Sequence, residues 1–161
     1  MLEVVCNTSP LQYLHQLGLL HLLPALAPKV IIPPAVVEEL AAGRKAGIEL
    51  PEVERLEWIE IRQPVSLAAL PLVTDLGPGE SQALALALEM PGTTVIVDDS
   101  LARRTAAALH IPLTGTLGVL LAAKRRGLIT EIAPILDHLQ ALRFRVSPVT
   151  RTAVLKLAGE S

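Results

Sequence analysis

The stretch of sequence that most constrains the fold is a run of three β-branched apolar residues at 95–97, which Asp98 and Asp99 follow directly. Such a run is typical of a strand that is buried on both faces, as in a parallel sheet. Ser100 then predicts the N-cap of a helix over the following residues, which are rich in Ala, Leu and Arg. Because ligands of open parallel sheets bind beyond the carboxyl ends of the strands, we expect the two acids at a binding site rather than in the core.

Short apolar runs alternate with helical patterns along all 161 residues. This alternation predicts an α/β fold, in which helices flank a central, mostly parallel sheet. A chain of this length suits one domain, so we expect residues 1–161 to form a single unit. The expected strands lie at residues 2–6, 30–32, 58–61, 95–97 and 111–114.

The composition limits both the compartment and the kind of partner. No apolar run reaches the roughly 18 residues needed to span a bilayer, so we expect no membrane anchor. The first five residues include no basic group, which argues against a secretion signal. Cys6 is the single cysteine, so an internal disulfide is excluded. We therefore expect a cytoplasmic protein whose one thiol is buried in a strand.

Charge is divided unevenly along a chain whose net charge is −2. Residues 1–100 hold 5 Lys and Arg against 13 Asp and Glu, whereas residues 101–161 hold 9 against 3. This division fits either an acidic site beside a basic rim or simply acidic and basic surface helices. The basic residues at 103–104 and 124–126 are accordingly either helix-surface charges or contacts to phosphate. The net charge argues against a general nucleic-acid binder, and three aromatic residues are too few for a base-stacking platform.

Polar residues with oxygen donors stand at the edges of several expected elements. Where such edges meet, the acids repel one another and need a cation between them. Oxygen donors without an accompanying His or Cys pattern select hard ions such as Mg²⁺ or Mn²⁺, which clamp phosphate and activate water. The pattern therefore indicates nuclease-type chemistry, although the same acids also fit solvated helix faces. The positions are Asn7, Glu38, Glu39, Glu80, Asp98 and Asp99.

Five short blocks stand in order at residues 7–11 (NTSPL), 32–40 (IPPAVVEEL), 76–80 (LGPGE), 97–103 (VDDSLAR) and 115–118 (GTLG). Together they resemble the PIN-domain family, and most closely its VapC-like branch from prokaryotic toxin–antitoxin pairs. The resemblance implies a Rossmann-like sheet, an acidic pocket with Mg²⁺ or Mn²⁺, and endoribonuclease activity on RNA. It also implies a homodimer and inhibition by a small cognate antitoxin protein. The apolar helix faces within residues 11–26 then either belong to the core or dock one of these partners.

The resemblance places the four acidic positions of the family on Asn7, Glu39, Glu80 and Asp98, as catalytic residues and metal ligands. Glu38 is the alternative to Glu39, because a shift of one residue on a helix changes which side chain points inward. Asp99 is expected beside the metal, as a further ligand or a hydrogen-bonding neighbour. The other polar residues brought to the pocket are Thr8 and Ser9 on its floor, and Thr114 and Thr116 near phosphate or water.

Asn7 is the position at which the chain departs from the family pattern, which has Asp there. The amide oxygen of Asn7 can still contact a metal, but the side chain has no charge, so we expect weaker metal binding rather than certain inactivity. Two functions stay open: an endoribonuclease with reduced activity, or a PIN-like module that binds RNA or antitoxin without cleavage. A nucleotide-binding or phosphatase-like protein fits less well, since the chain has neither a phosphate-binding loop nor an aspartyl nucleophile motif.

Overall fold

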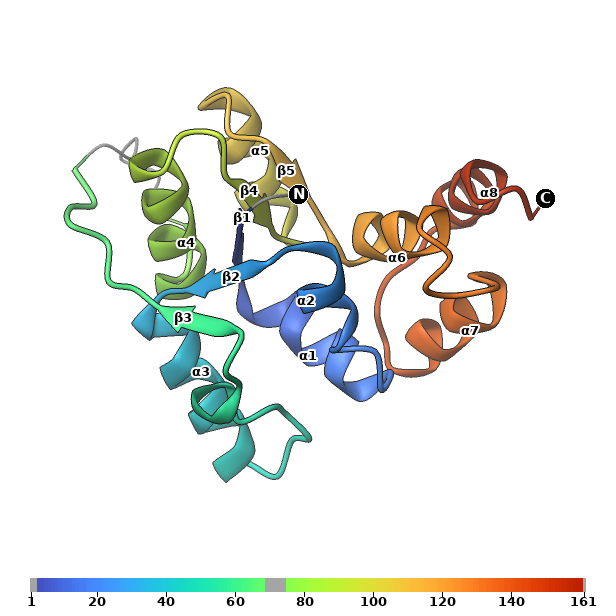
Figure 1. Cartoon of the computed structure of the whole chain (residues 1–161), viewed down its shortest axis with the longest axis horizontal. Coiled ribbons are helices and arrows are strands. Elements are labelled where there is room, and N and C mark those ends of the chain that lie inside the picture. The colour runs from blue at the N-terminus through green and yellow to red at the C-terminus, as the bar shows by residue number, and fades with distance from the viewer. Residues whose placement is uncertain (1–2, 69–74, 161) are drawn as a thin grey trace.

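The computed structural model describes residues 3–68 and 75–160, and their central element is a parallel sheet (Figure 1). Five strands are present in these residues, in the order β3-β2-β1-β4-β5, and every neighbouring pair is parallel. The α/β fold with a central parallel sheet is therefore confirmed. The strands are β1 (Glu3–Cys6), β2 (Lys29–Ile32), β3 (Ile59–Ile61), β4 (Thr94–Ile96) and β5 (Leu113–Thr114).

Helices cover both faces of the sheet. The helices described are α1 (Thr8–Gln16), α2 (Leu22–Leu26), α3 (Pro34–Lys45), α4 (Pro78–Glu89), α5 (Ser100–Ala108), α6 (Thr116–Arg125), α7 (Ala133–Ala141) and α8 (Pro148–Leu157), with a 3₁₀ helix at Val53–Arg55. Val4 and Ile96 pack on one face with α1, α2, α6 and α7, whereas Val5 and Val95 pack on the other with α4 and α5. This alternation follows from the two-residue period of a strand.

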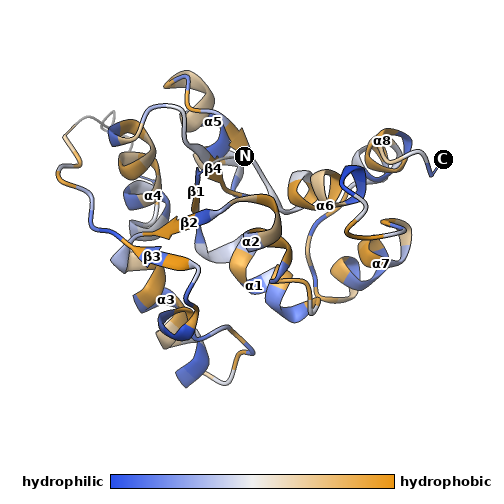
Figure 2. Cartoon of the chain, viewed as in Figure 1, coloured by the Kyte–Doolittle hydropathy of each residue, from blue (hydrophilic) through white to orange (hydrophobic). Residues whose placement is uncertain are grey.

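Hydropathy follows the same layers. Figure 2 shows hydrophobic colour on β2 and β3 and hydrophilic colour at the outer end of α3. Within the described residues, no helix is both long enough and apolar enough to cross a membrane.

The sheet has its topological switch point between β1 and β4. From β1 the chain leads to β2 and β3 on one side, and it then returns through α4 to β4 on the other side. Ligands of such sheets bind in the crevice at the carboxyl ends of these two strands. Asn7 follows β1, and its backbone N–H donates to the carbonyl of Ile96, the last residue of β4, at 3.0 Å. Asp98 lies just beyond the end of β4, so the fold brings both residues to this crevice.

The helix after β4 begins one residue earlier than predicted. Ser100 is the first residue of α5, and the N-cap is Asp99, whose carboxylate accepts the backbone N–H of Ala102 at 2.9 Å. Aspartate is as good an N-cap as serine and adds a negative charge at the positive end of the helix. The prediction of Ser100 as the cap was therefore wrong by one position.

The apolar side chains of α1 and α2 belong to the core. Leu11 and Leu14 of α1, and Leu22 and Leu23 of α2, are at most 1% exposed. They pack with the sheet, α6 and α7 in a single cluster. Of the two interpretations of residues 11–26, the core is therefore the one observed for these four side chains.

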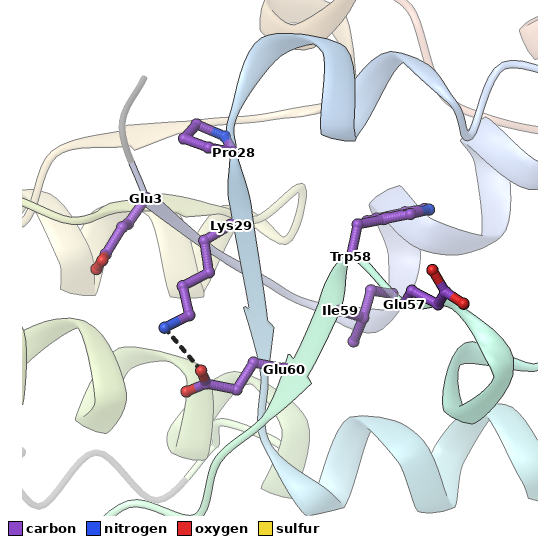
Figure 3. A pocket seen from close by; sticks show the side chains of 7 residues that line it. All are labelled: Glu3, Pro28, Lys29, Glu57, Trp58, Ile59 and Glu60. Atoms are coloured by element: carbon purple, nitrogen blue, oxygen red, sulfur yellow. Dashed lines mark ion pairs between the residues drawn. The ribbon is translucent and has the colours of Figure 1, made fainter.

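A cavity of about 600 Å³ lies at the amino ends of the strands, whereas the switch-point crevice lies at their carboxyl ends (Figure 3). Its lining comes from the amino ends of the strands and includes Glu3, Lys29 and Glu60. Figure 3 shows Lys29 and Glu60 pointing toward one another, and Lys29 Nζ is 2.8 Å from Glu60 Oε1. The hydrogen bond from Lys29 is the main cause that lowers the pKa of Glu60. This ion pair ties β2 to the edge strand β3, which gives Lys29 and Glu60 a structural role.

Glu160 fastens the segment after α8 to the start of α7. Its carboxylate accepts the backbone N–H groups of Ile132 and Ala133 at 2.7 and 3.0 Å, and it accepts Lys124 Nζ at 2.8 Å. These hydrogen bonds, that of Lys124 first, lower the pKa of Glu160 to about 2. Glu160 thus caps α7, whose own N-cap residue Ile132 has no polar side chain.

We expect Glu160→Gln to lower the free energy of unfolding near neutral pH. A carboxyl whose pKa is lower in the folded state contributes stability above its unfolded pKa, and this contribution is lost as pH falls toward about 2. Urea unfolding of both proteins at pH 6, 4 and 2 measures the effect. The difference between their midpoints should shrink at each step to lower pH, whereas an equal difference at all three values would contradict the ionic role of Glu160.

Candidate active site

Asn7 occupies the centre of the switch-point crevice. It lies directly after β1, at the N-cap of α1, and is only 4% exposed. Its side chain makes no capping hydrogen bond to α1, and its Oδ1 atom is buried without a hydrogen-bond donor among the described residues. A buried acceptor without a donor is costly and uncommon in folded proteins. The Asn7 oxygen is therefore free to bind a cation or a donor supplied by a ligand.

Glu39 of α3 stands close to Asn7. One carboxylate oxygen accepts the hydroxyl of Thr8 at 2.5 Å, and the other accepts the backbone N–H of Gly79 at 3.3 Å. A Cβ atom on Gly79 would lie 2.5 Å from Glu39 Oε1 and 3.1 Å from Asn7 Oδ1. A side chain at position 79 would thus displace Glu39 or Asn7, so Gly79 leaves room for both of these oxygens. Glu38, the alternative ligand, is exposed.

Asp98 is held by the first residue of α6. The backbone N–H of Thr116 donates to Asp98 Oδ1 at 2.8 Å, and the Thr116 hydroxyl donates to Asp98 Oδ2 at 2.7 Å. Burial raises the pKa of Asp98 above its ordinary value, while both Thr116 hydrogen bonds and the charge of Arg103 act in the opposite direction. Arg103 also donates to the backbone carbonyl of Val97 at 2.9 Å. It is therefore part of the site and more than a surface charge on its helix.

We expect Thr116→Val to raise the pKa of Asp98 further. The substitution removes the hydroxyl donor and leaves the backbone N–H, so the ionised carboxylate is less stabilised. An NMR titration of the Asp98 carboxyl carbon measures this shift. Thr105→Val is the matched control, because Thr105 is also buried but its hydroxyl donates to the carbonyl of Leu101. A pKa of Asp98 that is unchanged or lower in Thr116→Val would contradict the role given to this hydroxyl.

Glu80 and Asp99 lie at the N-termini of two helices that flank the crevice. Glu80 is half-buried in the first turn of α4, where a Cβ on Gly77 would lie 2.7 Å from its Oε2 atom. Its carboxylate thus folds back on the first turn of its own helix. Asp99 is exposed and uses one oxygen to cap α5. Asp99 therefore has less freedom to bind a metal than its position in the sequence suggested.

These elements enclose a cleft of about 550 Å³. Four of the six oxygen-donor positions selected from the sequence line it: Asn7, Glu80, Asp98 and Asp99. Glu39 is not part of the lining and meets the site through Thr8 and Gly79. The cleft is thus an acidic hollow at the topological switch point of the sheet.

The segment after α7 also lines the cleft, with Arg143, Phe144 and Arg145. No sequence motif selects these residues, and the one signal for them is the excess of basic residues in the second part of the chain. The structure places two of those arginines beside acids from the first part. This arrangement favours a basic rim as the interpretation of the uneven charge.

The family follows from a match over almost the entire chain. The model of the family described as DUF3368, PIN domain, matches residues 3–160. The chain belongs to the PIN-domain family. PIN domains are generally nucleases, they bind nucleic acid, and they usually use divalent metal ions. Neither a curated protein nor a solved structure matches this chain.

The donor atoms of this PIN domain fit a hard divalent cation. All of them are oxygens, and the buried Oδ1 of Asn7 has no donor among the described residues. Across residues 3–68 and 75–160, however, no three His, Cys, Asp or Glu side chains are close enough to hold a metal between them. A cation held here would therefore need the amide oxygen of Asn7 beside at most two of the acids. An uncharged donor at this position fits a weakly held ion.

Proposed function

We propose that this PIN domain is a metal-dependent endoribonuclease of a toxin–antitoxin pair, acting in the cytoplasm on RNA phosphodiester bonds. The observation that carries the proposal is the buried oxygen of Asn7, which has no donor among the described residues and lies in a cleft that Glu80 and Asp98 line. The proposed ligands of Mg²⁺ or Mn²⁺ are Asn7 with two of the three acids Glu39, Glu80 and Asp98, because no three acids among the described residues are close enough to share an ion. Asp99 is a neighbour of this site. When bound, the metal supplies polarisation of the phosphate and a lowered pKa of water.

The chain's own residues hold this site in place. Thr116 fixes both oxygens of Asp98, and Thr8 and the Gly79 backbone fix both oxygens of Glu39. Carboxylates with fixed positions lose little conformational freedom when a cation or substrate binds. The Asp98 carboxylate repels other anions. We therefore expect the RNA phosphate to approach from the side of the cleft that Arg143 and Arg145 line.

The ends of the RNA products test this chemistry. In hydrolysis, a water oxygen bonds to phosphorus and the bond from phosphorus to the 3′ oxygen breaks, which leaves a 5′-phosphate and a 3′-hydroxyl. Attack by the neighbouring 2′-hydroxyl, which needs no metal, leaves a 2′,3′-cyclic phosphate instead. We expect 5′-phosphate ends that ligate to an adaptor and that disappear with EDTA. Cyclic phosphate ends, or cleavage that persists with EDTA, would contradict a metal-dependent hydrolase.

The toxin role is supported by the order of the five sequence blocks. It implies two protein partners, a cognate antitoxin and a second copy of this chain. Induced expression in a bacterial host tests the role through the growth rate. The unaltered chain should slow growth and Asp98→Ala should not, and a small open reading frame just upstream of the gene should restore growth when it is co-expressed. Equal growth with both chains would remove the toxin assignment.

A binding module without catalysis is the second candidate, and Asn7 is the observation that favours it. A site with a neutral residue in place of an acid can retain RNA or antitoxin binding after its metal affinity has fallen. RNA binding by the folded chain, together with no cleavage in Mg²⁺ or Mn²⁺, would favour this module over the nuclease.

A further inference from the structure

A second cavity, of about 340 Å³, adjoins the cleft on the other side of Asp98. Its lining includes Arg103, and it shares Asp98, Phe144 and Arg145 with the first cleft. Asp98 thus stands between two hollows that have one wall in common. Phe144 and Arg145 form this shared wall, and Arg143 extends it along the first cleft only. We call residues 143–145 the arginine wall.

Arg143 has a backbone conformation that favours glycine. Its φ of 71° lies in the left-handed region, directly after the C-cap of α7. At the same position after α1, α6 and α8 the chain has Gly18, Gly127 and Gly159. An arginine costs stability there, and strained residues of this kind cluster at functional sites. The side chain of Arg143 lines the first cleft beside the acids.

Phe144 adds an aromatic ring to the wall. It packs against Tyr13, which also lines the first cleft, with ring centroids 4.9 Å apart and an interplanar angle of 85°. The segment between α7 and α8 accordingly runs close to α1 in Figure 1. Two of the three aromatic residues of the chain therefore meet beside Asp98. The low aromatic count excluded an extended base-stacking platform, but it does not exclude a single base at this pair.

We propose that the arginine wall binds single-stranded RNA that passes Asp98 and continues on both sides of it. The inference rests on the proposed function, which places the scissile phosphate at Asp98. Arg143 contacts the RNA backbone in the first cleft, Arg103 contacts it in the second cavity, and Arg145 contacts it at Asp98 between them. Phe144 offers its ring to an unpaired base. Arginines beside aromatic rings suit a strand in which phosphates and bases alternate, whereas an acidic polypeptide needs only the arginines.

Binding of a fluorescein-labelled 8-nucleotide RNA without structure, followed by anisotropy in EDTA, tests the wall without any need for cleavage. We expect Arg145→Ala and Arg143→Gly each to raise the Kd about tenfold. Each substitution should also reduce the slope of log Kd against log salt by about 0.7, because one phosphate contact is lost. A circular single-stranded RNA should bind as tightly as a linear one, since the proposed path of the RNA continues on both sides of Asp98.

Two matched controls separate binding from folding. His110 follows α5 with a φ of 59° and lines neither cavity. Both His110→Gly and Arg143→Gly should therefore raise Tm by about 2–4 °C, since each relieves a strained backbone. Only Arg143→Gly should weaken RNA binding. Arg126→Ala removes an exposed arginine at the end of α6 away from Thr116, and it should leave the Kd and its salt slope unchanged.

Several results would overturn the inference. These are no measurable binding by the unaltered chain, an unchanged Kd in both Arg143→Gly and Arg145→Ala, or an equal loss in Arg126→Ala. Poly-glutamate that binds as tightly as the RNA, and that loses the same affinity in the variants, would assign the wall to an acidic protein partner instead. If the variants bind RNA as tightly as the unaltered chain and the protein cleaves RNA, RNA binding by the arginine wall is contradicted but the nuclease function is supported. If RNA binding depends on the arginines but the protein does not cleave RNA, RNA binding by the arginine wall is supported and the nuclease function is contradicted.

Discussion

Asn7→Asp is expected to increase RNA cleavage in Mn²⁺ at least tenfold over the unaltered chain. The substitution places a negative charge where a neutral, buried oxygen now stands. Two unit charges 4 Å apart interact by about 4 kcal/mol at an effective dielectric of about 20. Repulsion from the neighbouring Glu39 takes back part of this gain, so the net effect is smaller. Initial rates on a short fluorescent RNA, measured over a range of Mn²⁺ concentrations, give the change in rate and in metal affinity together.

The thermal stability of the same variant supplies an independent readout. Without metal, the added carboxylate lies buried near Glu39, so Asn7→Asp should melt at a lower temperature than the unaltered chain in EDTA. With Mn²⁺ in excess the order should reverse, because the ion stabilises the form that binds it more tightly. Asn7→Ala is the control, since it removes the oxygen and should show little stabilisation by Mn²⁺. Equal melting temperatures of Asn7→Asp with and without metal would contradict a metal site at Asn7.

Asp98→Asn and Asp98→Ala are expected to lower cleavage at least a thousandfold, which corresponds to about 4 kcal/mol of transition-state stabilisation. Asp98 is the acid that both cavities share, and Thr116 fixes both of its oxygens. Asparagine keeps the shape and one acceptor for the Thr116 N–H, so a loss of activity in Asp98→Asn reflects the charge rather than the fold. Circular dichroism and Tm, recorded beside the rates, show that the variant is folded.

Asp137→Asn is the matched control for the loss of an aspartate charge. Asp137 is exposed on α7 and pairs with Arg151 at 2.9 Å, outside both cavities. Exposed ion pairs of this kind contribute little stability. Full activity in Asp137→Asn together with no activity in Asp98→Asn would assign the effect to the site. Activity within about threefold of the unaltered chain in Asp98→Asn would contradict the catalytic assignment.

The strands and the position of the site were predictable because they depend on local patterns. The apolar run before Asp98 is buried on both sides, as a central parallel strand requires, and the acids after it lie at the switch point. Asn7 was placed correctly at the same edge, since it directly follows the first strand. The cap of α5 was missed by one residue because Asp99 and Ser100 are both good caps and the sequence does not rank them.

Other parts of the site could not be predicted, because tertiary packing creates them. Gly79 was interpretable from sequence only as part of a turn, and its close approach to Glu39 and Asn7 depends on how α3 and α4 pack. Arg143 and Arg145 belong to no motif, and they line the same cleft as Asp98 after the chain leaves α7 through a left-handed residue. The choice between Glu38 and Glu39 likewise depended on the rotation of α3, which leaves Glu38 exposed.

The most direct test of the central claim is cleavage of a mixed pool of single-stranded RNA by the unaltered chain with Mn²⁺, with Mg²⁺ and with EDTA, beside Asp98→Asn. We predict cleavage in at least one metal, none in EDTA, and none by Asp98→Asn in any condition. The claim would be contradicted by equal cleavage with EDTA, by equal cleavage with Asp98→Asn, or by no cleavage from folded protein of both the unaltered chain and Asn7→Asp.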